Sequence, residues 1–553
     1  MIKKTSIGLF LGILSFNVFC QSDSLQYLVY FSDKNNTPYS LQNPGSFLSE
    51  ESIERRRKQG ISLDILDLPV DPNYVSQLKA IDGLTLKYTS KWLNAAVISF
   101  NNPATLAAVE ALNFTSVPVA LRNVRSAAKD LLPSQESSSR NQLPLSYQSN
   151  IYGSSFNQVA MHRGHLLHEA GFTGAGINIA VIDAGFDQAD VLPVFDHLRE
   201  NDLLTSVYDF VDDDNDVFGG SSHGTFVLST VGGYMLDSLI GTAPDANYWL
   251  FRTEDSQNEN PIEESNWIAA AEMADSLGVD LITTSLGYSQ FDNAVLDYSP
   301  DQMDGTTAII TRGAEIASSR GIVVLNSAGN KGNTEWNIIT APADARNVIS
   351  VGAVAADSSH ASFSSYGPSA DGRVKPEVMA LGEQSTYANF AGGISRGNGT
   401  SFACPILAGL AASLMQAHPK VSSSQIREAI LQSANLFYTP TNEMGYGIPD
   451  LWSAHVYLTG GLNSRDNQLQ VLAYPNPFED YVTIVVENIN IQNFSIKLFD
   501  IQGREITIPS EFVLQQESLV RRLNLSFLSD GFYILEVESN SERSVLNLVR
   551  RSF

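Results

Sequence analysis

The sequence predicts an α/β fold in which helices flank a parallel sheet, with a small α+β domain before it and a β-sandwich after it. Three observations lead to this prediction. Short apolar runs alternate with helical segments between about residues 174 and 455, strand and helix patterns mix before residue 119, and helical patterns stop after residue 469. Strand–helix alternation favours a parallel sheet, whereas closely spaced strands without helices favour a sandwich.

The first unit spans residues 25–119 and mixes both periods. Strands are expected at 25–31, 84–90 and 94–100, and helices at 49–60, 73–81 and 104–112. The next stretch, residues 122–158, is rich in Ser, Asn and Gln and has no hydrophobic period. Such a composition is typical of a linker.

The central unit contains strands that are apolar on both faces, such as "INIAVID" and "NVISVGAV". Further strands are expected within 278–287 and 321–330, and helices within 260–278 and 306–321. In the first of these helices, Asn260 suits the N-cap, Pro261 the first helical position and Gly278 the exit. Ligands of parallel sheets bind at the carboxyl ends of the strands, so residues that follow these strands are site candidates.

The last unit has short strands separated by Asn, Pro, Gly and Asp, which indicates a small β-sandwich. These strands are expected at 481–488, 494–500 and 531–539. The whole chain has 553 residues, 43% of them hydrophobic, which is enough for several separate cores. Its formal net charge of −26 would repel a polyanion, so we expect no nucleic-acid partner.

The N-terminus, "MIKKTSIGLFLGILSFNVFC", has two lysines before an apolar run that is too short to span a bilayer comfortably. This pattern predicts a secretory signal. Cleavage after Cys20 leaves Cys404 as the only cysteine, which excludes an intramolecular disulfide. A lipoprotein anchor at Cys20 is a second interpretation, disfavoured because Asn17-Val18-Phe19 lacks small residues. No later stretch is a better membrane candidate, so the mature chain is expected to have no transmembrane segment.

Three polar residues fit one chemical scheme. Asp183 ends an apolar strand, His223 precedes a run of small residues, and Ser401 lies at a glycine-rich turn before a helix. A serine hydroxyl attacks a carbonyl only if a base takes its proton, and a carboxylate must orient that base. Asn330, just after a buried strand, can donate a hydrogen bond to the developing oxyanion, and the backbone N–H of Ser401 can supply a second.

From about residue 150 to 458, the chain resembles the subtilisin-like serine protease family. The motifs that carry the resemblance occur in the family's order and are "VIDAGFD", "SSHGTFV", "GTAPDA", "TTSLGY", "SAGNKG", "VGAV", "FSSYGP" and "NGTSFACP". The resemblance implies a subtilisin-like α/β domain in which Asp183 orients, His223 is the general base and acid, Ser401 attacks and Asn330 stabilises the oxyanion. It also implies that the substrate cleft is lined by Ser285, Leu286, Gly287, Ser327, Ala328 and Gly329.

Two positions depart from the family pattern. A Ser or Thr usually follows the aspartate, but this chain has Ala184, which removes a supporting hydroxyl and leaves the carboxylate in place. The run "ITAPADA" places Thr340 where the family often has a small residue at the bottom of the main specificity pocket. We therefore expect large side chains to be disfavoured there.

Both flanking units also resemble parts of known secreted proteins. Residues 25–119 resemble the family's inhibitory propeptide, and residues 469–553 resemble the C-terminal sorting domain of the type IX secretion pathway, through "YPNPFEDYVTI", "IKLFDIQGREI" and "LSFLSDGFYILEVES". The resemblance implies export by the signal peptide and then across the outer membrane, to the medium or the cell surface. The predicted domains are a signal peptide at 1–20, a propeptide plus linker at 21–145, a catalytic domain at 146–459 and a sorting sandwich at 469–553.

Three other clusters have competing interpretations. His162, His165 and His168 have helical spacing but no completing ligands, which favours an ordinary helix over a zinc site. Asp212, Asp213, Asp214 and Asp216 favour a solvated turn, and leave a stabilising calcium ion as the alternative. Glu254, Glu259, Glu263 and Glu264 could select basic peptide side chains, but a solvent-facing first turn of a helix explains Glu263 and Glu264 equally well.

Cys404 competes with Ser401 for the nucleophile's role. Cys404, Leu407, Ala408 and Ala411 share one helical face, and the opposite face is apolar too. We therefore expect Cys404 to be a small core residue, and its neighbour Pro405 to lie in the first turn of the helix.

The prediction is a secreted, monomeric serine endopeptidase, made as a precursor, that acts on proteins or peptides and needs no cofactor. Its further partner is the type IX secretion machinery. A surface-displayed binding protein on a degenerate protease scaffold is the main rival, and the intact set of four site residues argues against it. A processing protease with a narrow target and a broad nutritional protease remain equally compatible with the sequence.

Overall fold

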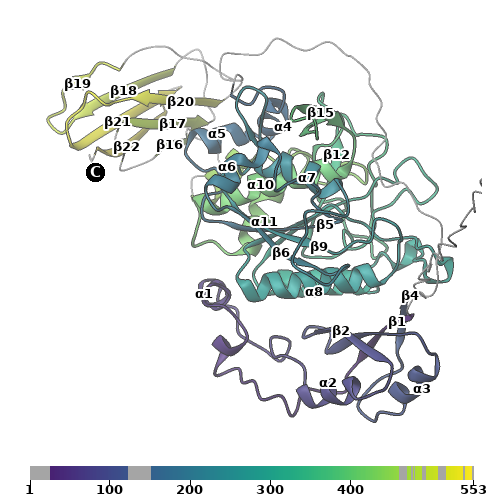
Figure 1. Cartoon of the computed structure of the whole chain (residues 1–553). Helices are drawn as coiled ribbons and strands as arrows, with labels where there is room; N and C mark the ends of the chain where they lie inside the picture. Colours follow the sequence, from purple (N-terminus) through teal and green to yellow (C-terminus); the bar gives the residue numbers. More distant parts are fainter. Residues whose placement is uncertain are drawn as a thin grey trace, which may run out of the picture.

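The computed structural model describes residues 25–122, 151–459, 470–474, 478, 480–487, 494–508, 518–539 and 542–550. The predicted signal peptide and most of the predicted linker lie outside this part of the chain. Figure 1 shows three units: an N-terminal α+β domain below the central domain, and a C-terminal sandwich on the other side of it.

The N-terminal domain has a four-stranded antiparallel sheet in the order β2-β3-β1-β4. Its helix α1 begins where the Ser49 side chain accepts a hydrogen bond from Ser52 N, and ends at Gly60 in the left-handed conformation. The elements are β1 (Leu25–Tyr30), α1 (Glu50–Gln59), α2 (Pro72–Lys79), β2 (Leu84–Ser90), β3 (Ala95–Phe100), α3 (Ala104–Glu110) and β4 (Val119–Arg122).

The central domain is built on a seven-stranded parallel sheet in the order β13-β12-β11-β10-β5-β9-β6. Along β5, Ile179 and Val181 face one hydrophobic core, whereas Ala180 and Ile182 face the other, which explains the continuous apolar run. The strands are β5 (Asn178–Asp183), β6 (Leu204–Asp209), β9 (Asn247–Arg252), β10 (Leu281–Thr284), β11 (Val323–Ser327), β12 (Ile349–Val354) and β13 (Val378–Leu381).

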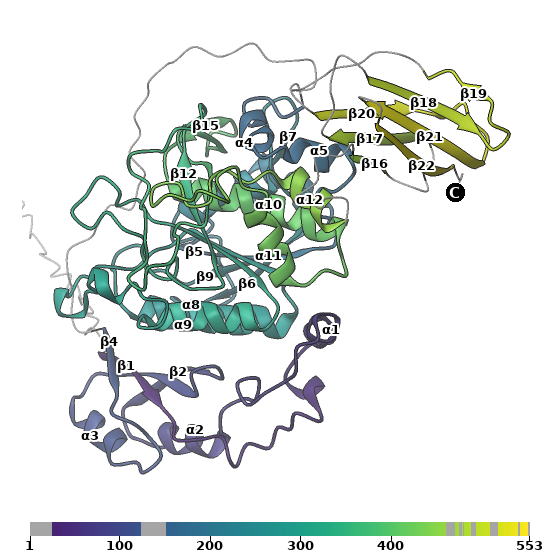
Figure 2. The same cartoon turned by 180° about the vertical axis from the view of Figure 1, so that it is seen from behind.

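Helices cover both faces of this sheet. One face packs mainly against α7 and α10, and the other against α8 and α9, which lie side by side in Figure 2. The first group comprises α4 (Phe156–Ala160), α5 (Gly164–Glu169), α6 (Asp196–Glu200), α7 (His223–Gly232), α10 (Thr400–Ala417), α11 (Ser423–Gln432) and α12 (Leu451–Leu458). The second comprises α8 (Ile262–Leu277) and α9 (Ile309–Ser319). Two small hairpins complete the domain: β7 (Tyr234–Met235) with β8 (Leu239–Ile240), and β14 (Ser385–Ala388) with β15 (Ile394–Gly397).

The strand order changes direction between β5 and β10. On one side of β5 lie β9 and then β6. On the other side lie β10, β11, β12 and β13, in the order in which they follow along the chain. A parallel sheet leaves a crevice at the carboxyl ends of its strands where the order reverses. Asp183 is the last residue of β5 and Ser285 directly follows β10, so the topology places two predicted site residues at this crevice.

Two local predictions are wrong. The side chain of Asn260 does not cap α8: Pro261 occupies the cap position, and the Glu263 carboxylate accepts a hydrogen bond from Asn260 N instead. The linker also ends earlier than residue 158, because Tyr152 and Val159 are buried in the central core and Ser155 Oγ bonds to Ile240 O. Gly278 does end α8, with a φ of 91°.

The C-terminal unit is a two-sheet sandwich, as predicted. Its sheets have the orders β16-β17-β20 and β19-β18-β21-β22 and enclose a separate core around Val482, Ile484 and Leu535. The strands are β16 (Gln470–Tyr474), β17 (Tyr481–Glu487), β18 (Phe494–Asp500), β19 (Glu505–Ile506), β20 (Ser518–Asn524), β21 (Gly531–Ser539) and β22 (Glu542–Arg550).

The N-terminal domain docks on α8 and α9. Its sheet packs Leu28 and Val97 against Ile262 of α8 and Ile309 of α9. At the other end of α8, Asp275 is fully buried and receives hydrogen bonds from three cations of the N-terminal domain. These are Arg55 Nη2 at 2.5 Å, Arg56 Nη2 at 2.8 Å and Lys91 Nζ at 3.2 Å.

Candidate active site

Asp183 and His223 lie together at the carboxyl end of β5. His223 is the first residue of α7, and its Nδ1 lies 2.7 Å from Asp183 Oδ1. The Asp183 side chain is fully buried, whereas that of His223 is 18% exposed. Burial lowers the pKa of His223, but the charge of Asp183 and its hydrogen bond outweigh burial and raise that pKa above its usual value. Asp183 therefore stabilises the protonated form of His223, and the other ring nitrogen, Nε2, is the one that can take up a proton.

Only one oxygen of the Asp183 carboxylate accepts hydrogen bonds from the described residues. Oδ1 accepts hydrogen bonds from Ala184 N and His223, whereas Oδ2 is buried with no hydrogen-bond partner among the described residues. This fits the expectation that Ala184 removes a supporting hydroxyl from the carboxylate.

Ser401 and Asn330 meet at the start of α10. Ser401 is the second residue of the helix, where backbone N–H groups have no intrahelical acceptor. Asn330 Oδ1 accepts hydrogen bonds from Thr400 N and Thr400 Oγ1, both at 2.9 Å. Because a backbone N–H can only donate, the amide oxygen must face Thr400, which leaves the Asn330 NH₂ group as a donor elsewhere.

A proline explains how the Ser401 backbone is tied to the cleft. Pro405 is the sixth residue of α10, beyond the first turn where we expected it, and it has no N–H to give to Ser401 O. Ser285 Oγ donates to that carbonyl instead, at 2.9 Å. The Ser401 hydroxyl in turn lies 3.5 Å from Ser285 O, so the loop after β10 contacts the predicted nucleophile twice.

Thr340 lies between the two predicted cleft segments. Its Oγ1 would be 2.2 Å from a Cβ added to Gly287 and 3.0 Å from one added to Gly329. Thr340 is buried, and this oxygen has no hydrogen-bond partner in the described chain. The side chain therefore fills space between the segments 285–287 and 327–329, where the sequence suggested a restricted pocket.

Cys404 is a packing residue. It is fully buried, and its Sγ lies 3.6 Å from both Thr283 Oγ1 and Thr284 O. Burial raises the pKa of the thiol to about 12, so the thiolate needed for nucleophilic attack is absent at neutral pH. This confirms the prediction made from helical periodicity.

The glutamate cluster does not face solvent. Glu254, Glu263 and Glu264 are each at most 5% exposed, which contradicts the solvent-facing interpretation. Glu263 accepts hydrogen bonds from Asp255 N and Asn260 N and thereby shapes the loop before α8. Burial raises the pKa of Glu254 and of Glu264 to about 8, and it also raises the pKa of Glu263 well above its usual value.

The histidine triplet serves the fold, but the ordinary helix expected for it is interrupted: His162 lies in the turn between α4 and α5, and His165 and His168 lie in α5. His162 Nδ1 lies 2.9 Å from Pro449 O, while His168 contacts Tyr152 OH and Thr242 O. Burial lowers the pKa of all three histidines to about 4. Among the described residues, no group of three His, Cys, Asp or Glu side chains is arranged to hold a metal ion.

The acidic loop after β6 holds an arginine that the sequence analysis missed. Arg252 Nη1 lies 2.6 Å from both Asp209 Oδ2 and Asp212 Oδ2. Asp213 Oδ1 accepts a hydrogen bond from Tyr208 OH, whereas Asp214 Oδ1 accepts from Asp216 N and Asp216 Oδ1 from Phe218 N in local turns. The parallel ends of β6 and β9 could have revealed this arginine, because Asp209 and Arg252 are each the last residue of their strand.

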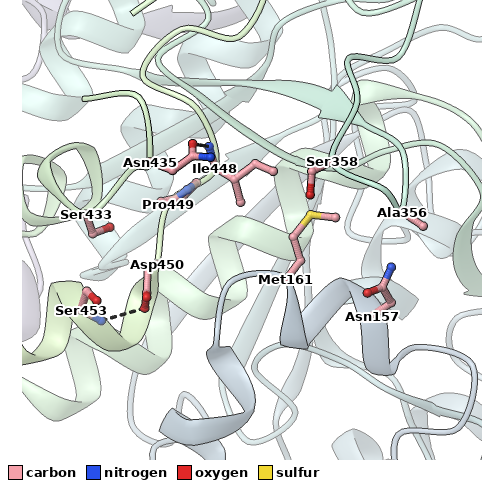
Figure 3. A pocket seen from close by; sticks show the side chains of 10 residues that line it. All are labelled: Asn157, Met161, Ala356, Ser358, Ser433, Asn435, Ile448, Pro449, Asp450 and Ser453. Carbon is pink, nitrogen blue, oxygen red and sulfur yellow. Dashed lines mark hydrogen bonds between the residues drawn. The ribbon is translucent and has the colours of Figure 1, made fainter. Parts of the chain in front are cut away.

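A separate pocket of about 390 Å³ lies away from these residues (Figure 3). It is lined by polar side chains such as Asn157, Ser358 and Asn435, and by Met161 and Ile448. None of the predicted catalytic residues lines it. In the part of the chain that is described, α10 is the one helix apolar and long enough to cross a membrane, and 78% of it is buried inside the central domain.

Comparisons with known proteins follow the same three units. The family model described as Subtilase family matches residues 174–447, Peptidase S8 propeptide domain, Bacteroidota matches 26–140, and Secretion system C-terminal sorting domain matches 472–550. Subtilisin NAT from Bacillus subtilis subsp. natto is 32% identical over 299 residues, which cover 53% of this chain and 68% of that protein. Subtilisin from Bacillus pumilus is 32% identical over 291 residues, which cover 52% and 92%. The solved structure of MycP1 from Mycobacterium smegmatis has a TM-score of 0.45 at 20% identity, covering 61% of this chain and 89% of that one.

Proposed function

Because the chain belongs to the subtilase family and is a serine-type endopeptidase, we propose that it cleaves peptide bonds through an acyl-enzyme formed on Ser401. One observation carries the proposal. His223 Nδ1 bonds to a buried carboxylate, Asp183, at the end of β5, and this leaves Nε2 as the nitrogen that can take a proton. Ser401 supplies the hydroxyl at the start of α10, beside the loop that follows β10.

The reaction follows from these groups. His223 Nε2 takes the Ser401 proton as Oγ bonds to the peptide carbonyl carbon, and Asp183 stabilises the imidazolium. The oxyanion accepts hydrogen bonds from the Asn330 NH₂ group, which Thr400 leaves free to donate, and from Ser401 N–H. His223 then protonates the leaving amine, and the same steps with water release the acid and restore Ser401.

The substrate cleft is formed by the segments 285–287 and 327–329. We expect a peptide to pair with these segments as an added strand. The main-chain hydrogen bonds of such a strand do not depend on the side chains, so peptides of many sequences can bind. Thr340 lies at the base of this cleft and favours small side chains next to the cleaved bond.

The flanking domains indicate a precursor that is exported. The docked N-terminal domain is the propeptide, and its release precedes full activity. The C-terminal sandwich directs the chain through the secretion machinery across the outer membrane, to the medium or the cell surface. We place the end of the signal peptide at residue 20, the end of the propeptide and linker at 145, the end of the catalytic domain at 459 and the start of the sorting domain at 469.

The test is the purified chain with Ser401→Ala, assayed on a chromogenic peptide and with a fluorophosphonate probe. We expect loss of hydrolysis by at least about 10⁴-fold and no labelling. The matched control is Cys404→Ala, which removes the thiol that competed with Ser401 for the nucleophile's role and should keep both signals. Hydrolysis that persists in the Ser401 variant of a homogeneous sample would rule out the mechanism.

A further inference from the structure

The loop that carries His223 begins at the end of β6 and is unusually acidic. Residues 210–222 lead from Asp209 to His223 and include four aspartates. Backbone hydrogen bonds fasten the loop to the segment after Asp183, through Phe186 N to Val217 O and Gly224 N to Gly185 O. These contacts fix the second half of the loop, whereas Phe210 N, which donates a hydrogen bond to Arg252 O, ties its first half to β9.

The side chain of Arg252, at the end of β9, also holds the first half of the loop. In the sheet, Arg252 is level with Asp183 on one neighbouring strand and with Asp209 on the other. Its guanidinium binds Asp209 and Asp212 at 2.6 Å each. Asp209 is 1% exposed and Arg252 9% in their side chains, so this pair is shielded from water.

The same guanidinium also packs against the far end of the loop. A Cβ added to Gly220 would lie 2.5 Å from Arg252 Nε and 2.9 Å from Ala184 O. Gly220 has a φ of 78° and precedes His223 by three residues. Arg252 therefore contacts both ends of one loop, beside the backbone that follows Asp183.

We propose that Arg252 is a positioning residue that clamps the acidic loop and thereby sets His223 against Asp183. The clamp supplies, from the protein itself, the positive charge that the buried Asp209 requires. Arg252 acts through the loop, because its guanidinium forms ion pairs with Asp209 and Asp212 and contacts neither catalytic side chain. The inference rests on the proposed function of His223.

The test compares Arg252→Met and Arg252→Lys with the parent in the full chain. For Met we expect kcat to fall about 10²-fold with KM nearly unchanged, because a misplaced base slows chemistry and not binding. The acidic limb of kcat/KM should also move to lower pH, since Asp183 raises the pKa of His223 only while the two are aligned. Lysine keeps the charge but not the forked geometry, so it should restore part of kcat.

The matched control is Arg346→Ala, which removes an exposed arginine paired with Asp371 and should change neither kcat nor the acidic limb. A folded Arg252→Met variant with the parent's kcat and pH profile would overturn the proposal, and so would a Lys variant no better than Met. If the Arg252→Met variant does not fold, the Arg252→Lys variant decides between the outcomes. A kcat and pH profile like the parent's would refute the clamp. A lower kcat together with an acidic limb of kcat/KM that has moved to lower pH would support it.

A second readout separates this proposal from the proposed function. In a Ser401→Ala background, Arg252→Met should speed amide hydrogen exchange at Gly224 and Phe186, whose N–H groups hold the loop to its neighbour. Unchanged exchange at both amides would refute the clamp even if the parent is active. Ser401-independent hydrolysis would instead refute the catalytic assignment and leave the exchange result standing.

Discussion

Neutralising Asp275 should release the N-terminal domain from α8. Asp275 is fully buried and lies within 3.2 Å of three cations of the docked domain. The substitution Asp275→Asn keeps the shape of the side chain but leaves Arg55 and Lys91 without this carboxylate. Removing one partner from a buried ion pair costs about 3–5 kcal/mol, because the other charge remains out of water. That energy corresponds to a roughly 10²- to 10⁴-fold weaker association.

The assay uses the Ser401→Ala chain with a site for a sequence-specific protease inserted between residues 123 and 150. After cleavage, the dissociation constant of the two parts is measured by dilution and gel filtration. The matched control is Glu54→Gln, which removes an exposed carboxylate paired with Arg57 on the same helix α1. We expect less than about fivefold change for the control, since surface pairs contribute 0–1 kcal/mol. An Asp275 variant that binds as tightly as this control would refute the reasoning.

The pH dependence of this contact has a definite sign. Burial raises the pKa of Asp275, but Lys91, Arg55 and Arg56 outweigh it and lower the pKa to about 2. A lowered carboxyl pKa adds stability above its unfolded value of 3.8, and that stability is lost as the pH falls toward 2. The docked domain should therefore stay bound at pH 5, and release at pH 5 would contradict this account.

Three further predictions concern the central domain. The acidic limb of kcat/KM should lie above the usual histidine value of about 6.5, because His223 must be neutral to accept a proton and its pKa is raised; Asp183→Asn should move the limb to lower pH, as read from pH–rate profiles. Thr340→Gly should raise kcat/KM by about tenfold for peptides with a large side chain before the cleaved bond, and leave alanine peptides unchanged in a library profile. A chelator should not lower the melting temperature, because Arg252 already binds the carboxylates of Asp209 and Asp212; a fall would indicate a bound calcium ion.

The sequence predicts those features that depend on local order along the chain. The apolar runs mark β5 and β10 because both faces of a parallel sheet are covered, and Gly278 marks the end of α8 because only a left-handed residue fits there. The motifs predict that Asp183 and His223 lie together, and the 2.7 Å contact between Asp183 Oδ1 and His223 Nδ1 supports this. Contacts between distant segments escape this reasoning. Arg252 carries no local pattern that pairs it with Asp209, and only the sheet register makes them neighbours.

Burial is the second property that the sequence hides, and it changes the charge near the cleft. The formal charge of −26 counts every carboxyl group as ionised. Burial penalises the charged forms of Glu254 and Glu264 and raises the pKa of each to about 8, although the hydrogen bonds that Tyr288 and Tyr298 donate to them lower it. Near neutral pH both groups hold their protons for most of the time. We therefore expect these glutamates to support Tyr288 and Tyr298 and not to select substrates with lysine or arginine.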